Sequence, residues 1–181
     1  AERRLRHHWR HSISCAVVAR NIAFFLREAD IDRFFVAGIL HNIGRMLLWI
    51  SLPELAERAV TRAMSDKDPL HIIEQDLLGF DHAKLGGALL ESWNLPPGLA
   101  RTASFHHQPT HPLSNTGDAA IIHLADLICQ AFGWGPDLDI PMICLDEKSW
   151  ELIDFPLNAL VTVVTQSELQ LHDILNILQD Q

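Results

Sequence analysis

Positively charged residues are scarce in this sequence of 181 residues. It has 14 Lys and Arg against 23 Asp and Glu, which gives a formal net charge of −9. Such a chain lacks the broad basic surface that binds a phosphate backbone, so nucleic-acid binding is disfavoured. The one basic cluster lies at the N-terminus and comprises Arg3, Arg4, Arg6 and Arg10. We interpret it as a solvated first helical turn, with contact to an acidic partner as the alternative.

Cysteines and long apolar runs are also in short supply. Cys15, Cys129 and Cys144 are far apart and form no Cys-x-x-Cys pair, which is typical of thiols in a reducing cytoplasm. No run of 18 or more uncharged apolar residues is present, and the N-terminus lacks the apolar segment of a signal peptide. We therefore expect a cytoplasmic protein without a membrane span. A start at Ala1 rather than Met suggests a processed chain or an excerpt from a longer protein.

What the sequence does contain is helical periodicity along almost its whole length. Apolar residues make up 48% of the chain, enough for a substantial core in one domain spanning residues 1–181. The pattern predicts an all-α helical bundle of about seven to eight helices. The expected helices are near 5–24, 31–50, 53–64, 69–78, 82–93, 97–107, 118–132 and 157–179.

Local signals place the ends of several of these helices. Asp68 followed by Pro69 predicts an N-cap with Pro at the first helical position, Gly79 a helix end, and Asp81 the N-cap of the next helix. The clearest loop is 108–117, and the break at 133–136 precedes a short, less regular region. The 31–50 segment is almost continuously apolar, which predicts a helix buried on all sides. Around Val161 the β-branched residues favour a strand, but the longer helical period outweighs them.

Eleven histidines are many for this length, and several occupy apolar helices. His11 lies in the first predicted helix, His41 in the buried second one, and Asp126 in the middle of a later one. A polar group in such a place costs roughly 1–3 kcal/mol unless a partner satisfies it. We therefore predict that these side chains converge on one pocket and are satisfied by a metal ion or by a shared polar network. If a polar network satisfies them, it would be the remnant of an ancestral metal site whose present role is only to stabilise the core.

Five motifs in order resemble the HD superfamily, and most closely the HDOD domains of bacterial signalling proteins. They are Trp9-Arg-His11-Ser, Ala37-Gly-Ile-Leu-His41-Asn-Ile-Gly-Arg45, Gly79-Phe-Asp-His82-Ala-Lys-Leu-Gly86, Phe105-His-His107 and Ile122-His-Leu-Ala-Asp126. The resemblance extends from about Trp9 to the C-terminal helix. It implies the HD-domain helical bundle and a role in signal transduction. Helices that usually precede this point in HDOD domains are short or absent, which again indicates an excerpt.

The resemblance also implies a set of metal ligands. His11, His41 and Asp126 match the principal metal-binding positions of the catalytic relatives. His82, His106 and His107 match the positions that hold a second metal in the HD-GYP phosphodiesterases. Neutral imidazoles and carboxylates suit iron, manganese or zinc, and hydrolysis further needs an open position at which bound water becomes acidic.

The sequence departs from the catalytic pattern at the pair that names the superfamily. His-Asp is His41-Asn42 here, and a neutral amide is a weaker ligand that cannot bridge two metals. Arg45 replaces the usual lysine, and the Gly-Tyr-Pro signature is missing from a chain that has no tyrosine. We therefore predict a non-catalytic regulatory output domain with a degenerate pocket, acting on other signalling proteins or binding a nucleotide-like ligand. The alternative is a metal-dependent phosphohydrolase of a nucleotide or cyclic dinucleotide, in which Arg45 steadies the phosphate.

The remaining histidines are assigned lesser roles. His7 is one turn before His11 and is a weaker pocket candidate, while His123 is expected to pack in the core. We expect four histidines at the surface: His8, His71, His111 and His172.

Overall fold

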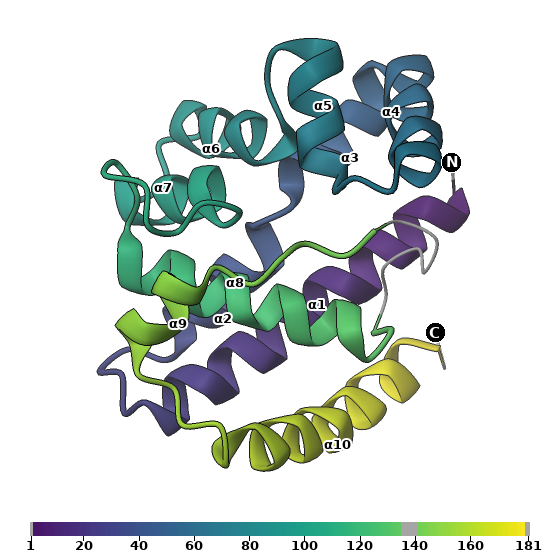
Figure 1. Cartoon of the computed structure of the whole chain (residues 1–181). Helices are drawn as coiled ribbons and strands as arrows, with labels where there is room; N and C mark the ends of the chain where they lie inside the picture. The colour runs from purple at the N-terminus through teal and green to yellow at the C-terminus, as the bar shows by residue number, and fades with distance from the viewer. Residues whose placement is uncertain (1, 135–140, 180–181) are drawn as a thin grey trace.

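The computed structural model describes residues 2–134 and 141–179, and within them it contains helices and no strand (Figure 1). The all-α prediction is thus confirmed, although these described residues contain ten helices rather than seven to eight. They are α1 (Glu2–Phe25), α2 (Asp32–Leu40), α3 (Ile43–Ser51), α4 (Pro53–Asp66), α5 (Leu70–Leu78), α6 (His82–Ser92), α7 (Pro97–Phe105), α8 (Thr116–Ala131), α9 (Glu147–Ile153) and α10 (Ala159–Gln179).

The helices form two halves, as Figure 1 shows. Each half has its own clusters of buried apolar residues, and Leu99 packs against clusters of both. The α1 half consists of α1, α2, α8, α9 and α10, and its core includes Ile22, Phe34, Ile122 and Phe155. The α6 half consists of α3 to α7, with smaller clusters between α4 and α5 and between α6 and α7. The halves meet where α2 continues into α3 and where α7 packs against α2 and α8.

The predicted single helix over 31–50 is wrong, because the chain breaks at His41 and Asn42. Asn42 has φ −105° and ψ 15°, outside the helical region. The two parts pack on different neighbours at very close range. A Cβ added at Gly38 would lie 2.4 Å from Ala16 Cα on α1, and one at Gly44 would lie 2.1 Å from the His82 carbonyl oxygen on α6. A straight helix could not reach both, and the break lies at the junction of the two halves.

The same break is relevant to whether the 31–50 segment could span a membrane. By length and composition, the segment Asp32–Ser51 could span a membrane, with a mean hydropathy of 1.4. Core helices of soluble proteins have the same length and composition. Its two helices have nine residues each, about 14 Å of rise, whereas a bilayer core is about 30 Å thick. Nor is the segment buried on all sides, since the side chains of Val36 and Ile50 are 46% and 64% exposed.

Most of the predicted helix ends are confirmed, and two details differ. The Asp81 carboxylate accepts a 2.8 Å hydrogen bond from the Lys84 main-chain N–H and caps α6. Gly79 ends α5 with φ +81°, a conformation that favours glycine. The predicted Asp68 cap is wrong, because Pro69 is the cap residue of α5 and no side chain caps it. The region expected to be irregular contains α9, capped by Asp146. Of the predicted 133–136 break, residues 135 and 136 lie outside the described residues.

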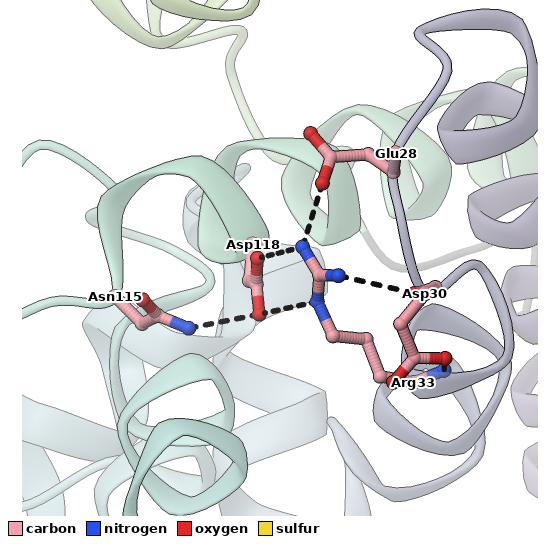
Figure 2. A network of polar contacts seen from close by, with 5 residues as sticks. All are labelled: Glu28, Asp30, Arg33, Asn115 and Asp118. Carbon is pink, nitrogen blue, oxygen red and sulfur yellow. Dashed lines mark hydrogen bonds and ion pairs between the residues drawn. The ribbon is translucent and has the colours of Figure 1, made fainter.

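A polar network joins the beginning of α2 to the beginning of α8 (Figure 2). The Arg33 guanidinium donates to both carboxylate oxygens of Asp118, at 3.2 and 3.3 Å, and to Glu28 at 2.7 Å. Asn115 also donates to Asp118, at 2.8 Å. Since α2 leads to His41 and α8 contains Asp126, this network helps to set the distance between two of the predicted ligands.

Candidate metal centre

All six predicted ligands lie where the two halves meet, and they form two groups of three. His11 of α1, His41 at the end of α2 and Asp126 of α8 form the first group, called the His11 site here. His82 of α6, with His106 and His107 at the end of α7, forms the second, called the His82 site. In each group the possible ligand atoms lie within 4.8 Å of one another. Each half of the fold thus supplies one group.

The His11 site contains a carboxylate that already has two partners. His11 Nε2 lies 3.1 Å from Asp126 Oδ1, and the Gln130 side-chain amide donates to the same oxygen at 2.8 Å. His41 Nδ1 donates to the Gly38 carbonyl oxygen at 2.7 Å. This bond leaves His41 Nε2 as a bare lone pair, fully buried and without a hydrogen-bond partner among the described residues. A buried unpaired nitrogen of this kind suits a metal ion.

The His82 site has no carboxylate among its three donors, but one lies directly behind it. His82 Nδ1 is 2.5 Å from Glu74 Oε2, and the same oxygen accepts the His82 main-chain N–H at 2.9 Å. His106 Nδ1 donates to the Ala103 carbonyl oxygen at 2.7 Å, which leaves its buried Nε2 without a partner in the described part of the chain. His107 Nε2 lies 2.9 Å from His82 Nε2. The pattern of second nitrogens bound to carbonyl or carboxylate oxygens is the one that orients metal-binding histidines.

The two sites are adjacent, and His106 lies between them. Its ring centroid is 5.1 Å from that of His41 and 5.8 Å from that of His82. Asn42 directly follows His41, its side chain is buried, and its Oδ1 has no hydrogen-bond partner among the described residues. A carboxylate in that position would add a buried negative charge next to His41 in the chain, and the amide adds none.

Burial keeps three of the pocket histidines, His41, His106 and His107, neutral near pH 7, which is the form that binds metal. Burial lowers the pKa of His41 to about 4, and it also lowers the pKa of His106 and His107 well below the usual histidine value. For Asp126, burial alone would raise the pKa, but the hydrogen bond from His11 and the nearby histidines outweigh it and lower the pKa. The pKa of Glu74 is likewise lowered, because its contacts with His82 outweigh burial. Both carboxylates are therefore ionised.

Three residues near the pocket were missed or misplaced by the sequence interpretation. His8 and His71 were expected at the surface, but His8 is buried, and the ring of half-buried His71 stacks on that of His107 at 4.1 Å. Glu74 was not considered, and only its acidic character beside Ile73 on an apolar helix could have drawn attention to it. His123 packs in the core as expected and in addition donates to the His106 carbonyl oxygen at 2.8 Å.

Arg45 lies on α3, one turn beyond His41. Its guanidinium carbon is 5.3 Å from the centre of the Trp49 ring, and its charge influences the pKa of both His8 and Glu74. His8 also contacts Trp49 edge-on, with 5.8 Å between ring centroids. A permanent positive charge is therefore present beside the histidine pocket.

The chain belongs to the HDOD domain family, whose sequence profile matches residues 1–109. The matched segment contains five of the six candidate ligands and Asn42, and it ends before Asp126. An uncharacterized protein of Treponema pallidum (strain Nichols) is 30% identical over 84 residues, which are 46% of this chain and 16% of that protein. The chain thus matches a small part of this longer relative.

Solved structures share the fold. A crystal structure of an HDOD domain protein with unknown function from Geobacter sulfurreducens has a TM-score of 0.75 at 24% identity, over 91% of this chain and 59% of that one. A protein from Marinobacter aquaeolei VT8, provisionally described as a signal transduction protein, has a TM-score of 0.77 at 16% identity, over 94% of this chain and 38% of that one. The fold of the described residues is therefore that of HDOD proteins.

Proposed function

We propose that this HDOD domain is a regulatory output domain whose pocket binds a divalent transition-metal ion and does not hydrolyse phosphodiesters. The observation that supports this most directly is Asn42, a buried neutral amide that directly follows His41, a member of one of the two groups of metal-binding side chains. The nearby His41 and His106 nitrogens, buried and unpaired among the described residues, favour the metal.

The chemistry of hydrolysis explains why one amide matters so much. A bound metal would supply Lewis acidity and lower the pKa of a water molecule. Two metals hold and activate that water well when a carboxylate bridges them, and Asn42 cannot bridge. The remaining negative groups are Asp126, already bonded to His11 and Gln130, and Glu74, which is turned toward His82. These residues suit retention of an ion better than turnover.

In this proposal the domain acts on other proteins of a signalling pathway, in the cytoplasm. Output domains that bind without catalysis transmit a signal through a change in stability or shape on ligand binding. The provisional description of the Marinobacter protein as a signal transduction protein is consistent with this role. Low basic charge argues against nucleic acid as the partner.

A turnover assay on the purified protein tests the proposal. The protein is incubated with Mn²⁺, Fe²⁺ or Zn²⁺ and with a cyclic dinucleotide, a mononucleotide and a generic phosphodiester. We expect no release of product above that of the His41→Ala variant, although the unmodified protein binds metal. Metal-dependent hydrolysis that His41→Ala abolishes would overturn the proposal.

Such a result would instead support the second candidate, a metal-dependent phosphohydrolase. The observation that favours it is Arg45, whose charge lies beside the pocket where a phosphate would bind. In that case Arg45→Met should raise KM for a phosphodiester at least tenfold, because a charged contact to phosphate contributes about 1.5–3 kcal/mol.

A further inference from the structure

The His82 site is built within one half of the fold. Glu74 comes from α5, His82 from α6, and His106 and His107 from the end of α7. These helices pack on one another in the α6 half, and α6 and α7 share the core of Leu90, Ala100 and Ala103. No residue of the His11 site contributes a donor to this group.

Two of the three imidazoles in this group, those of His82 and His106, have a second ring nitrogen bonded to an oxygen. The Glu74 carboxylate contacts His82 at both the ring Nδ1 and the main-chain N–H, so the tautomer and the first turn of α6 are held by a single oxygen. Because Nδ1 then carries the proton, His82 Nε2 presents a lone pair. The Ala103 carbonyl does the same for His106. The ring of His107 is stacked on that of His71, and its Nε2 lies 2.9 Å from His82 Nε2, but its Nδ1 has no partner among the described residues.

The His11 site is less ready for an ion. His11 Nδ1 has no hydrogen-bond partner within the described residues, so nothing there fixes the tautomer that would free Nε2. Its Nε2 is instead paired with Asp126, whose Oδ1 also accepts from Gln130. A metal would have to replace the His11–Asp126 contact, and the adjacent Asn42 offers only a neutral oxygen.

We propose that the His82 site binds one zinc-class ion by itself, with Glu74 as the positioning residue that orients His82 and balances the charge of the ion. This rests on the proposed function, in which the pocket binds metal, and it names the half that does so. Three neutral imidazoles suit zinc or cobalt, whereas manganese and magnesium prefer oxygen ligands. The ion needs neither Asp126 nor a carboxylate at position 42.

The experiment is a metal titration of the metal-free chain with Zn²⁺ and Co²⁺, against a chromophoric chelator, with Mn²⁺ for comparison. The variants are Glu74→Gln, Asp126→Asn and His106→Gln, and the matched control is Glu91→Gln, which changes an exposed glutamate on α6. The visible spectrum of bound Co²⁺ reports the ligands independently of activity. Circular dichroism of each variant in chelator shows whether it is folded.

We expect the unmodified chain, Asp126→Asn and Glu91→Gln to bind one Zn²⁺ with similar affinity and the same Co²⁺ spectrum. Glu74→Gln should bind it 10- to 100-fold more weakly, which is the usual effect of losing an outer carboxylate. His106→Gln should lose the high-affinity site. Mn²⁺ should compete at least 100-fold less well than Zn²⁺.

Two results would overturn this inference while leaving the proposed function intact. One is a Glu74→Gln variant that binds Zn²⁺ as tightly as the unmodified chain. The other is loss of the ion in Asp126→Asn, which would locate it in the His11 site or between the sites. If Glu74→Gln is unfolded, the contrast between His106→Gln and Asp126→Asn decides. An unmodified chain that binds none of the three ions would overturn the proposed function itself.

Discussion

At the scale of single residues, Asn42 differs from the aspartate of the superfamily motif by one charge in a fully enclosed place. Its side chain is 3% exposed and its Oδ1 lacks a partner among the described residues. Asn42 directly follows His41, whose ring lies 5.1 Å from that of His106 and which belongs to the same group as Asp126. The chemistry of the pocket should therefore respond strongly to this one position.

The Asn42→Asp variant should bind a second metal ion. A carboxylate directly after His41 supplies a second anionic ligand in addition to Asp126, whose Oδ1 is already paired with His11 and Gln130, so the ion content should rise from one to two per chain. In chelator the same variant should lose roughly 1–3 kcal/mol of unfolding free energy, because it buries an uncompensated charge beside Asp126. Native mass spectrometry and urea unfolding measure the two effects.

The exposed Asn94 provides the control for that substitution. Asn94→Asp adds the same charge away from the pocket and should change neither ion content nor stability in chelator. An Asn42→Asp protein with unchanged ion content would argue against the assignment of this residue to the pocket.

The buried His41 should make the stability of the metal-free chain depend on pH. Burial lowers the pKa of His41 from 6.5 to about 4, so between these values the unfolded chain binds a proton that the folded chain does not. The unfolding free energy should therefore fall as the pH drops from 6.5 toward 4, by on the order of 3 kcal/mol for this group.

Urea unfolding in chelator at several pH values isolates this contribution. The difference in unfolding free energy between the unmodified chain and His41→Asn should be largest at pH 7 and should shrink toward pH 5. Parallel curves for the two proteins would contradict the assignment of a low pKa to His41.

At the scale of helices, the close packing of α3 on α6 sets the distance between the two metal-binding groups. Gly44→Ala should destabilise the protein by about 1–3 kcal/mol, because the new methyl group would meet main-chain atoms of His82 and Gly86 at 2.1 and 2.5 Å. Gly117→Ala is the matched control, since nothing lies within 4 Å of its Cβ. Thermal unfolding of the two variants should differ clearly, and equal melting temperatures would show that the helices separate freely.

The network around Arg33 joins α2 to α8 and should be weaker in effect. Its groups are partly exposed, so Arg33→Met should cost only about 0.5–1.5 kcal/mol. A double-mutant cycle with Asp118→Asn measures the direct coupling between the two helices. A coupling energy near zero would mean that the helix packing alone holds Asp126 in place.

The helices themselves could be read from the sequence, but their interruption at His41 and Asn42 could not. Both sides of the break are apolar and no proline marks it. Asn42 is the N-cap residue of α3, but its side chain makes no capping hydrogen bond. The cause is tertiary, namely that Gly38 packs on α1 and Gly44 on α6. The six candidate ligands were found through the family motifs. Glu74, His8 and His71 were missed because their contacts depend on how α5 and α1 are oriented in space, which periodicity does not specify.

At the scale of the whole molecule, the histidine pocket lies where the two halves of the fold meet. The His11 site belongs to the α1 half and the His82 site to the α6 half, with the His41–Asn42 break between them. An ion held in one half changes the charge beside the other, since His106 lies close to both His41 and His82. In the proposed regulatory role, binding of an ion in one half would therefore act on the group in the other half.

The metal content of the protein as isolated tests the central claim most directly. The chain is purified without chelator from cells supplied with zinc, iron and manganese, and its metals are counted by elemental analysis alongside the His106→Gln variant. We predict about one transition-metal ion per unmodified chain, chiefly zinc, and a large loss in the variant. An unmodified chain that contains no metal, or that contains as much as His106→Gln, would contradict the account.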